Sequence, residues 1–106
     1  MFDEETSRIR KQQKFLQDVE QGIAEANRRI IHARIDRLDK ASFVAFATRV
    51  AELRAAYLEA ALAASRGRGD FAALPALREA YDEAKAAFAA LERAIERGYV
   101  DIADAG

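Results

Sequence analysis

The chain contains no cysteine and no tryptophan, and its 106 residues include one proline, one histidine and five glycines. Without cysteine there is no disulfide framework, no thiol nucleophile and no cysteine-ligated zinc site. The low glycine and proline content excludes a collagen-like or proline-rich chain. Neither sign of charge dominates, because 17 basic side chains face 18 acidic ones. This balance argues against a strongly basic nucleic-acid binder.

Long hydrophobic runs and targeting segments are also lacking. The first eight residues are mostly charged or polar, so we expect no signal peptide. The most apolar stretch, residues 41–64, is interrupted by Arg49, Glu52, Arg54 and Glu59, which argues against a membrane span. We therefore expect a cytoplasmic protein. The 25 alanines and the excess of arginine over lysine indicate a bacterial origin.

Alanine, glutamate, arginine, leucine and glutamine dominate the chain, and all five favour helices. There is no alternating β-branched run and no Asn-Gly or Asp-Gly hairpin turn. The sequence therefore predicts one all-α domain over 1–106, an antiparallel three-helix bundle or coiled coil with a long N-terminal helix. We place its helices at about 3–37, 40–65 and 75–97, followed by an acidic tail over 99–106.

The first segment carries apolar residues seven positions apart, namely Phe2, Ile9, Leu16, Ile23 and Ile30. Val19, Ala26 and Ala33 occupy the intermediate positions, which completes the a/d seam of a coiled coil. Gly22 is the weak point of this helix, since glycine costs ~1 kcal/mol relative to alanine in a helix interior.

The second segment has no glycine or proline to mark its beginning. Asp39 is the predicted N-cap, with Leu38 and Phe43 placed as a hydrophobic staple around it. One row of residues spaced by seven comprises Phe43, Val50, Tyr57 and Ala64. A wider set comprising Val44, Leu58 and Leu62 indicates that this helix contacts more than one neighbour.

The clearest turn is the segment 66–70, where Gly67 or Gly69 can adopt the left-handed conformation that ends a helix. Pro75 suits the first turn of the third helix, and Gly98 is the candidate that ends it. The short turn predicts an antiparallel hairpin of the second and third helices. We expect the first helix to pack antiparallel to the second.

The first helix is too long for its companions. It spans roughly 50 Å, whereas the other two span roughly 35–40 Å. About ten to fifteen of its residues thus lack a partner within the chain, although the apolar seam continues there. A seam that its own chain cannot cover needs another chain.

We therefore predict a homodimer or higher oligomer, or a helical protein partner, joined through the first helix. The predicted interface comprises Ile9, Gln12, Gln13, Leu16, Val19 and Ile23. Gln12 lies at a d position, where a polar residue usually fixes register and partner number. The alternative interpretation is that Gln12 and Gln13 mark a frayed, solvated end of the helix.

The residues offer little for chemistry. His32, the single histidine, lies beside the seam and reads as a surface residue, and neither Glu-x-x-His nor His-x-x-x-His occurs. Carboxylates such as Glu79 and Glu83 alternate with cations on predicted solvated faces. The glycine-containing turn lacks the Lys-Ser/Thr of a phosphate loop. We predict no catalytic residue, no metal site and no cofactor, and hence no enzyme.

The sequence is most consistent with a non-enzymatic helical protein–protein interaction module, such as an adaptor, a small chaperone or an assembly component. The alternative is a small DNA-associated or regulatory protein that uses the basic parts of the first helix. Residues 1–40 hold nine basic and eight acidic groups, so this balanced segment disfavours a nucleic-acid partner. A further alternative is that the alanine-rich core binds a small apolar ligand.

Overall fold

The computed structural model describes residues 3–103, and over this range the protein is all-α, as predicted. It has three α-helices, α1 (Glu4–Arg34), α2 (Lys40–Ser65) and α3 (Leu74–Glu96), and a short 3₁₀ helix, η1 (Phe71–Ala73). The long N-terminal helix and the three-helix arrangement are confirmed. Gly22 does not interrupt α1, which is continuous through it. Phe2, the first position of the predicted seam, and residues 104–106 lie outside the described residues.

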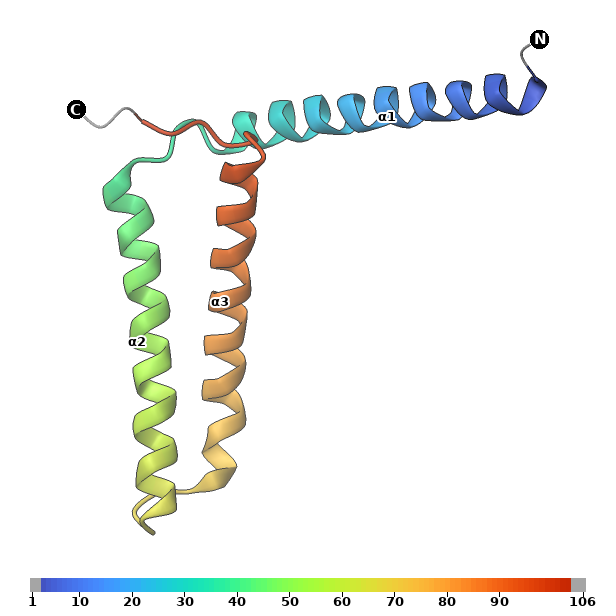
Figure 1. Cartoon of the computed structure of the whole chain (residues 1–106). Helices are drawn as coiled ribbons and strands as arrows, with labels where there is room; N and C mark the ends of the chain where they lie inside the picture. The colour runs from blue at the N-terminus through green and yellow to red at the C-terminus, as the bar shows by residue number, and fades with distance from the viewer. Residues whose placement is uncertain (1–2, 104–106) are drawn as a thin grey trace.

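The helices α2 and α3 form the predicted antiparallel hairpin and lie side by side along their length (Figure 1). Aromatic rings pack together at the end of the hairpin where α2 begins and α3 ends. The ring centroid of Phe88 lies 4.9 Å from that of Phe43 and 5.3 Å from that of Phe46. Tyr57 and Tyr81 stack at 6.4 Å farther along. Val50 and Ala64 are buried on the α2 side of this contact. The row of residues spaced by seven in the second segment therefore faces α3.

The expected antiparallel packing of the first helix along the second is not found within the chain. Instead, α1 projects away from the hairpin, and only its C-terminal end lies near α2 and α3 (Figure 1). The molecule is consequently elongated, with extents of 78 × 40 × 19 Å. We call residues 4–25 of α1 the arm.

The first helix also ends earlier than predicted, because Ile35 adopts an extended conformation with φ −123° and ψ 99°. The linker 35–39 pairs with the C-terminal segment 99–103 instead. The Leu38 amide donates to the Asp101 carbonyl at 2.9 Å, and the Ala103 amide donates to the Leu38 carbonyl at 2.9 Å. These two bonds form a parallel bridge between Leu38 and Ile102. Val100 is buried beside it, so the start of the predicted acidic tail is an ordered part of the fold.

The predicted helix ends are confirmed in detail. The Asp39 side chain accepts a hydrogen bond from the Ser42 amide at 2.7 Å and caps α2. Gly67 and Gly98 have φ of 74° and 76°, and each ends a helix with the paired backbone bonds of a Schellman motif. Pro75 lies in the first turn of α3, as expected.

Gly22 and Gly67 form a matched pair for substitution, because an added Cβ would meet no atom within 4 Å at either position. Only the backbone differs, since Gly67 has positive φ and Gly22 is helical. We expect Gly22→Ala to stabilise α1 by ~1 kcal/mol. Gly67→Ala should destabilise the hairpin by about 1–2 kcal/mol, since L side chains disfavour the left-handed region. Circular dichroism at 222 nm during thermal and urea unfolding measures both effects. If both substitutions change the stability in the same direction, this prediction is wrong.

The cap of α2 should also make the stability of the protein pH-dependent. The hydrogen bond from the Ser42 amide lowers the pKa of Asp39 below its ordinary value of 3.8. The stabilisation from the charged cap is therefore present above pH 3.8, and it is lost as the pH falls through the lower native pKa. Asp39→Asn keeps the cap without titrating, whereas Asp39→Ala removes it.

Between pH 7 and pH 2 we thus expect the melting temperature of the native protein to fall more than that of Asp39→Asn. Asp39→Ala should melt lower than both at pH 7. If the melting temperatures of the native protein and Asp39→Asn fall equally across this pH range, the charge of Asp39 contributes nothing to the cap.

Candidate partner interface

The arm has no covered surface in this structure. Every residue from position 3 to position 25 is exposed, on all sides of the helix. Partial burial begins only at Ala26 and Asn27, where α1 approaches the rest of the chain. A helix normally gains most of its stability from packing an apolar face, and here that face is bare.

The predicted interface residues do lie together on one side of the arm. Helical spacing places one set of seam positions on a single face, which we call the α1 stripe: Ile9, Gln12, Leu16, Val19, Ile23 and Ile30. Its apolar members are between 38% and 59% exposed. Gln13, also predicted, lies beside the stripe and is exposed. The structure thus groups these residues without showing what covers them.

Phe15 is an interface candidate that the heptad analysis missed. It is the most exposed of the large apolar side chains, at 66%. A shallow surface groove on the arm is lined by Arg8, Lys11, Gln12, Phe15 and Leu16. Phe15 occupies a g position beside the seam, so the a/d pattern alone passed over it. Its size and its place next to Leu16 were the signals that could have identified it.

A second uncovered apolar surface lies on α2. Val44, Leu58 and Leu62 are each about half exposed, although they were expected to meet another helix. Ala51 and Ala55 are exposed between them. We call these five residues the outer α2 face, because they lie on the side of α2 away from the ring contacts with α3. Among the described residues nothing packs on this face.

Contacts at the end of α1 set the direction of the arm. The Arg28 guanidinium donates to the Gly98 carbonyl at 2.8 Å and lies 3.4 Å from the Asp101 carboxylate. His32 Nδ1 lies 3.1 Å from the other oxygen of Asp101. Because Arg28 and His32 project from the side of α1 opposite the α1 stripe, the contact with the tail leaves that stripe free.

The side chains of this junction are largely exposed. His32 was predicted to be a surface residue, and its side chain is 51% exposed. The Asp101 side chain is 41% exposed, so solvent screens the Arg28–Asp101 ion pair. These contacts link α1 to the C-terminal segment, and an open surface pocket beside them is lined by Glu25, Arg28, Arg29, His32 and Asp101.

Among the described side chains outside the helix caps, Tyr81 has a shifted pKa. The Arg54 Nε donates to the Tyr81 hydroxyl at 3.0 Å, and this bond lowers the pKa of the phenol from its ordinary value of 10.0. The Lys85 ammonium lies 4.9 Å from the ring centroid and acts in the same direction. These contacts join α2 to α3 across an exposed edge of the hairpin.

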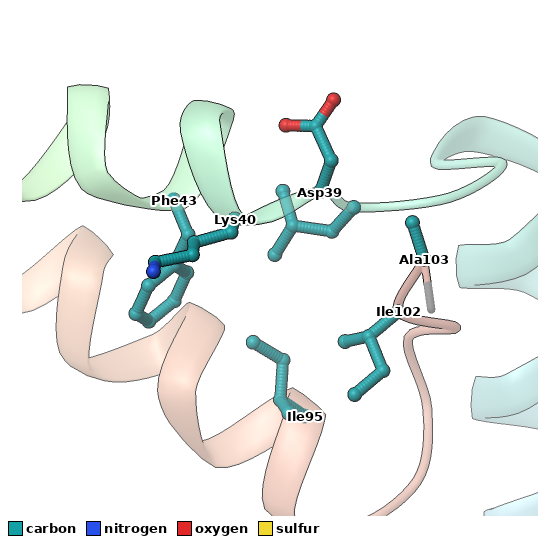
Figure 2. Close-up of a pocket in the computed structure, with 7 residues that line it drawn as sticks. Asp39, Lys40, Phe43, Ile95, Ile102 and Ala103 are labelled. Atoms are coloured by element: carbon teal, nitrogen blue, oxygen red, sulfur yellow. The ribbon is translucent and has the colours of Figure 1, made fainter. Parts of the chain in front are cut away.

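A small cleft lies where the C-terminal segment meets the hairpin. Figure 2 shows Phe43, Ile95 and Ile102 around this opening, with the Asp39 carboxylate pointing away from it. Asp39 is already engaged as the cap of α2. The lining therefore offers apolar contacts and one cation, Lys40, as its polar group. This arrangement does not specify a ligand.

Comparison with protein-family models, with curated proteins and with solved structures finds no match to the chain. Within residues 3–103, no three histidine or acidic side chains converge as a metal site would require. Over the same range, no helix is long and apolar enough to cross a membrane. The two uncovered apolar surfaces, and the junction that separates them, are the features of the described residues that bear on function.

The junction allows a direct test of what positions the arm. Arg28→Ala removes both bonds to the C-terminal segment, whereas Arg29→Ala is a matched control at an exposed neighbour. We expect Arg28→Ala to lower the free energy of unfolding by at most about 1 kcal/mol, as exposed ion pairs are weak. It should nevertheless broaden the distance distribution between spin labels on the arm and on the hairpin.

Because the chain has no cysteine, Lys14→Cys and Ala86→Cys place the two labels uniquely. Doubly labelled chain is diluted with unlabelled chain so that pulsed electron resonance reports distances within one molecule. An unchanged distribution in Arg28→Ala would mean that the Leu38–Ile102 bridge and the His32–Asp101 contact hold the arm without Arg28.

Proposed function

We propose that this protein is a non-enzymatic helical interaction module of the bacterial cytoplasm, an adaptor or assembly component that binds a helical partner through its arm. The supporting observation is the bare arm: residues 3–25 are exposed on every side, yet the α1 stripe repeats through them. Helix-on-helix packing is the recognition mode that suits such a repeat.

The energetics favour a covered arm. An isolated helix is marginally stable in water, even when its residues are good helix formers. Full burial of one large aliphatic side chain contributes ~1.5–3 kcal/mol relative to exposure. Ile9, Leu16, Val19, Ile23 and Ile30 are each 38–59% exposed. Completing their burial would supply roughly 4–7 kcal/mol toward ordering the arm and binding a partner.

Polar residues along the arm would select the partner and its register. Gln12 interrupts the apolar run at a d position, where a matching polar group of the partner helix would be favoured. Arg8 and Lys11 line one edge of the groove beside Phe15. Opposite charges in the partner would suit this edge, which adds specificity more than affinity.

The test replaces apolar residues of the arm while leaving the hairpin untouched. In lysate of the native host, the tagged native chain should elute in an assembly larger than one chain. Leu16→Asp/Ile23→Asp should elute as a single chain and keep the helical signal of α2 and α3. Gln17→Asp/Gln21→Asp adds the same charge to the opposite side of the arm and should elute like the native chain. A native chain that elutes alone, or a double variant that still assembles, would refute the proposed role of the arm.

A further inference from the structure

The chain carries two bare apolar surfaces with the same spacing, one on α1 and one on α2. The outer α2 face, followed from its N-terminal end, consists of Val44, Ala51, Ala55, Leu58 and Leu62. The α1 stripe, followed from its C-terminal end, contains Ile30, Ile23, Val19, Leu16 and Gln12. The steps are 7, 4, 3 and 4 residues in both cases. Two helices with such surfaces can pack antiparallel in coiled-coil fashion.

Two bulky residues of the arm would then lie opposite alanines. In the register that aligns these two rows, Ile23 meets Ala51 and Val19 meets Ala55. The remaining pairs are Ile30 with Val44, Leu16 with Leu58 and Gln12 with Leu62. The lengths of the two helices also agree. The 31 residues of α1 span about 46 Å, and the 26 residues of α2 span about 39 Å. An alanine opposite a bulky residue lets the two backbones approach closely, as a well-packed seam requires.

The same chain cannot make this contact, because the bonds of Arg28 and Leu38 hold the arm away from its own hairpin. Building on the proposed function, we propose that the partner of the arm is a second copy of this chain. The arm of each copy lies antiparallel on the outer α2 face of the other. This exchange is reciprocal about a two-fold axis, as in an isologous dimer.

Charges at the ends agree with this direction. Antiparallel packing brings the acidic first turn of the arm, Glu4 and Glu5, to the end of α2 that carries Arg66 and Arg68. Two unfavourable pairs result, because Arg8 of the arm lies level with Arg66 and Glu20 of the arm lies opposite Glu52. The Glu52 carboxylate accepts a hydrogen bond from Arg49 at 3.2 Å, which offsets the repulsion between the two glutamates.

Pairing of two arms with each other is the rival arrangement. A parallel pair of arms places Arg29 opposite Arg34 twice and Glu5 opposite Glu5 in the seam. Any pairing of arms alone also leaves Val44, Leu58 and Leu62 half exposed on each hairpin. Reciprocal exchange covers both surfaces of both copies with no third component, and it completes a three-helix bundle on each side.

The absence of cysteine permits a position-specific test. Val19→Cys and Ala55→Cys are made as separate chains and mixed in equal amounts under mild oxidation. The mixture should form a disulfide-linked dimer, while each variant alone should not. Lys14→Cys, on the opposite side of the arm, should give no dimer with Ala55→Cys. A dimer from Val19→Cys alone would overturn reciprocal exchange and indicate arm–arm pairing.

Light scattering of the purified chain gives an independent readout. The native chain should have the mass of two chains, and Leu58→Glu/Leu62→Glu should raise the dimer Kd about a hundredfold or more. Mixing that variant with Leu16→Asp/Ile23→Asp should restore dimers, because one of the two exchanged contacts is then native on both sides.

Other outcomes of the light-scattering measurement distinguish a failure of this inference from a failure of the proposed function. A native dimer that survives Leu58→Glu/Leu62→Glu overturns the exchange but leaves an arm that binds helices. A purified native chain that is monomeric also overturns it, whereas assembly in the host lysate would still support a different helical partner.

Discussion

The C-terminal segment determines the shape of this protein by holding the arm away from the hairpin. Two backbone bonds tie Leu38 to Asp101 and Ala103, and Arg28 reaches across to Gly98 and Asp101. These bonds pull the linker out of the helical conformation and turn the chain between α1 and α2. Without them, the spacing of apolar residues would favour a first helix folded along the second. The direction of the arm, its bare stripe and the bare outer face of α2 all result from this one junction.

The hairpin explains how a thin core can support this geometry. Few of the described side chains are buried, and the contact between α2 and α3 depends on phenylalanine rings near one end, on the Tyr57–Tyr81 stack farther along and on alanines such as Ala64. The Schellman motifs at Gly67 and Gly98 end the helices at defined residues, which aligns the hairpin and directs the chain back toward α1. The second motif matters most, because it places residues 99–103 where they can pair with the linker.

A chain with a thin core and half-exposed aliphatic residues would gain stability from association that buries those residues. The α1 stripe and the outer α2 face are apolar surfaces of similar length on two different helices of one molecule. Each could be covered by an unrelated helix, but their matched spacing makes a second copy the simplest occupant. A dimer built in this way would form on each side the three-helix packing that a single chain does not complete.

Much of the local structure followed from the sequence, for physical reasons that apply to short segments. The cap at Asp39, the left-handed glycines at 67 and 98, the hairpin turn and the extent of α2 and α3 depend on neighbouring residues only. The seam of the first helix was likewise visible in its spacing, and it identified the residues of the candidate interface except Phe15.

The placement of α1 was decided by tertiary structure. Periodicity shows that a helix has an apolar side, but not which surface meets it, so the same seam suits a neighbour within the chain or in another molecule. The early end of α1 at Arg34 depends on residues more than sixty positions away, whose pairing with Leu38 no local pattern predicts. The sequence by itself determined which segments are helical and which sides are apolar. Only the contact between the linker 35–39 and the C-terminal segment 99–103, which lie far apart in the sequence, decided that the arm points away from the hairpin.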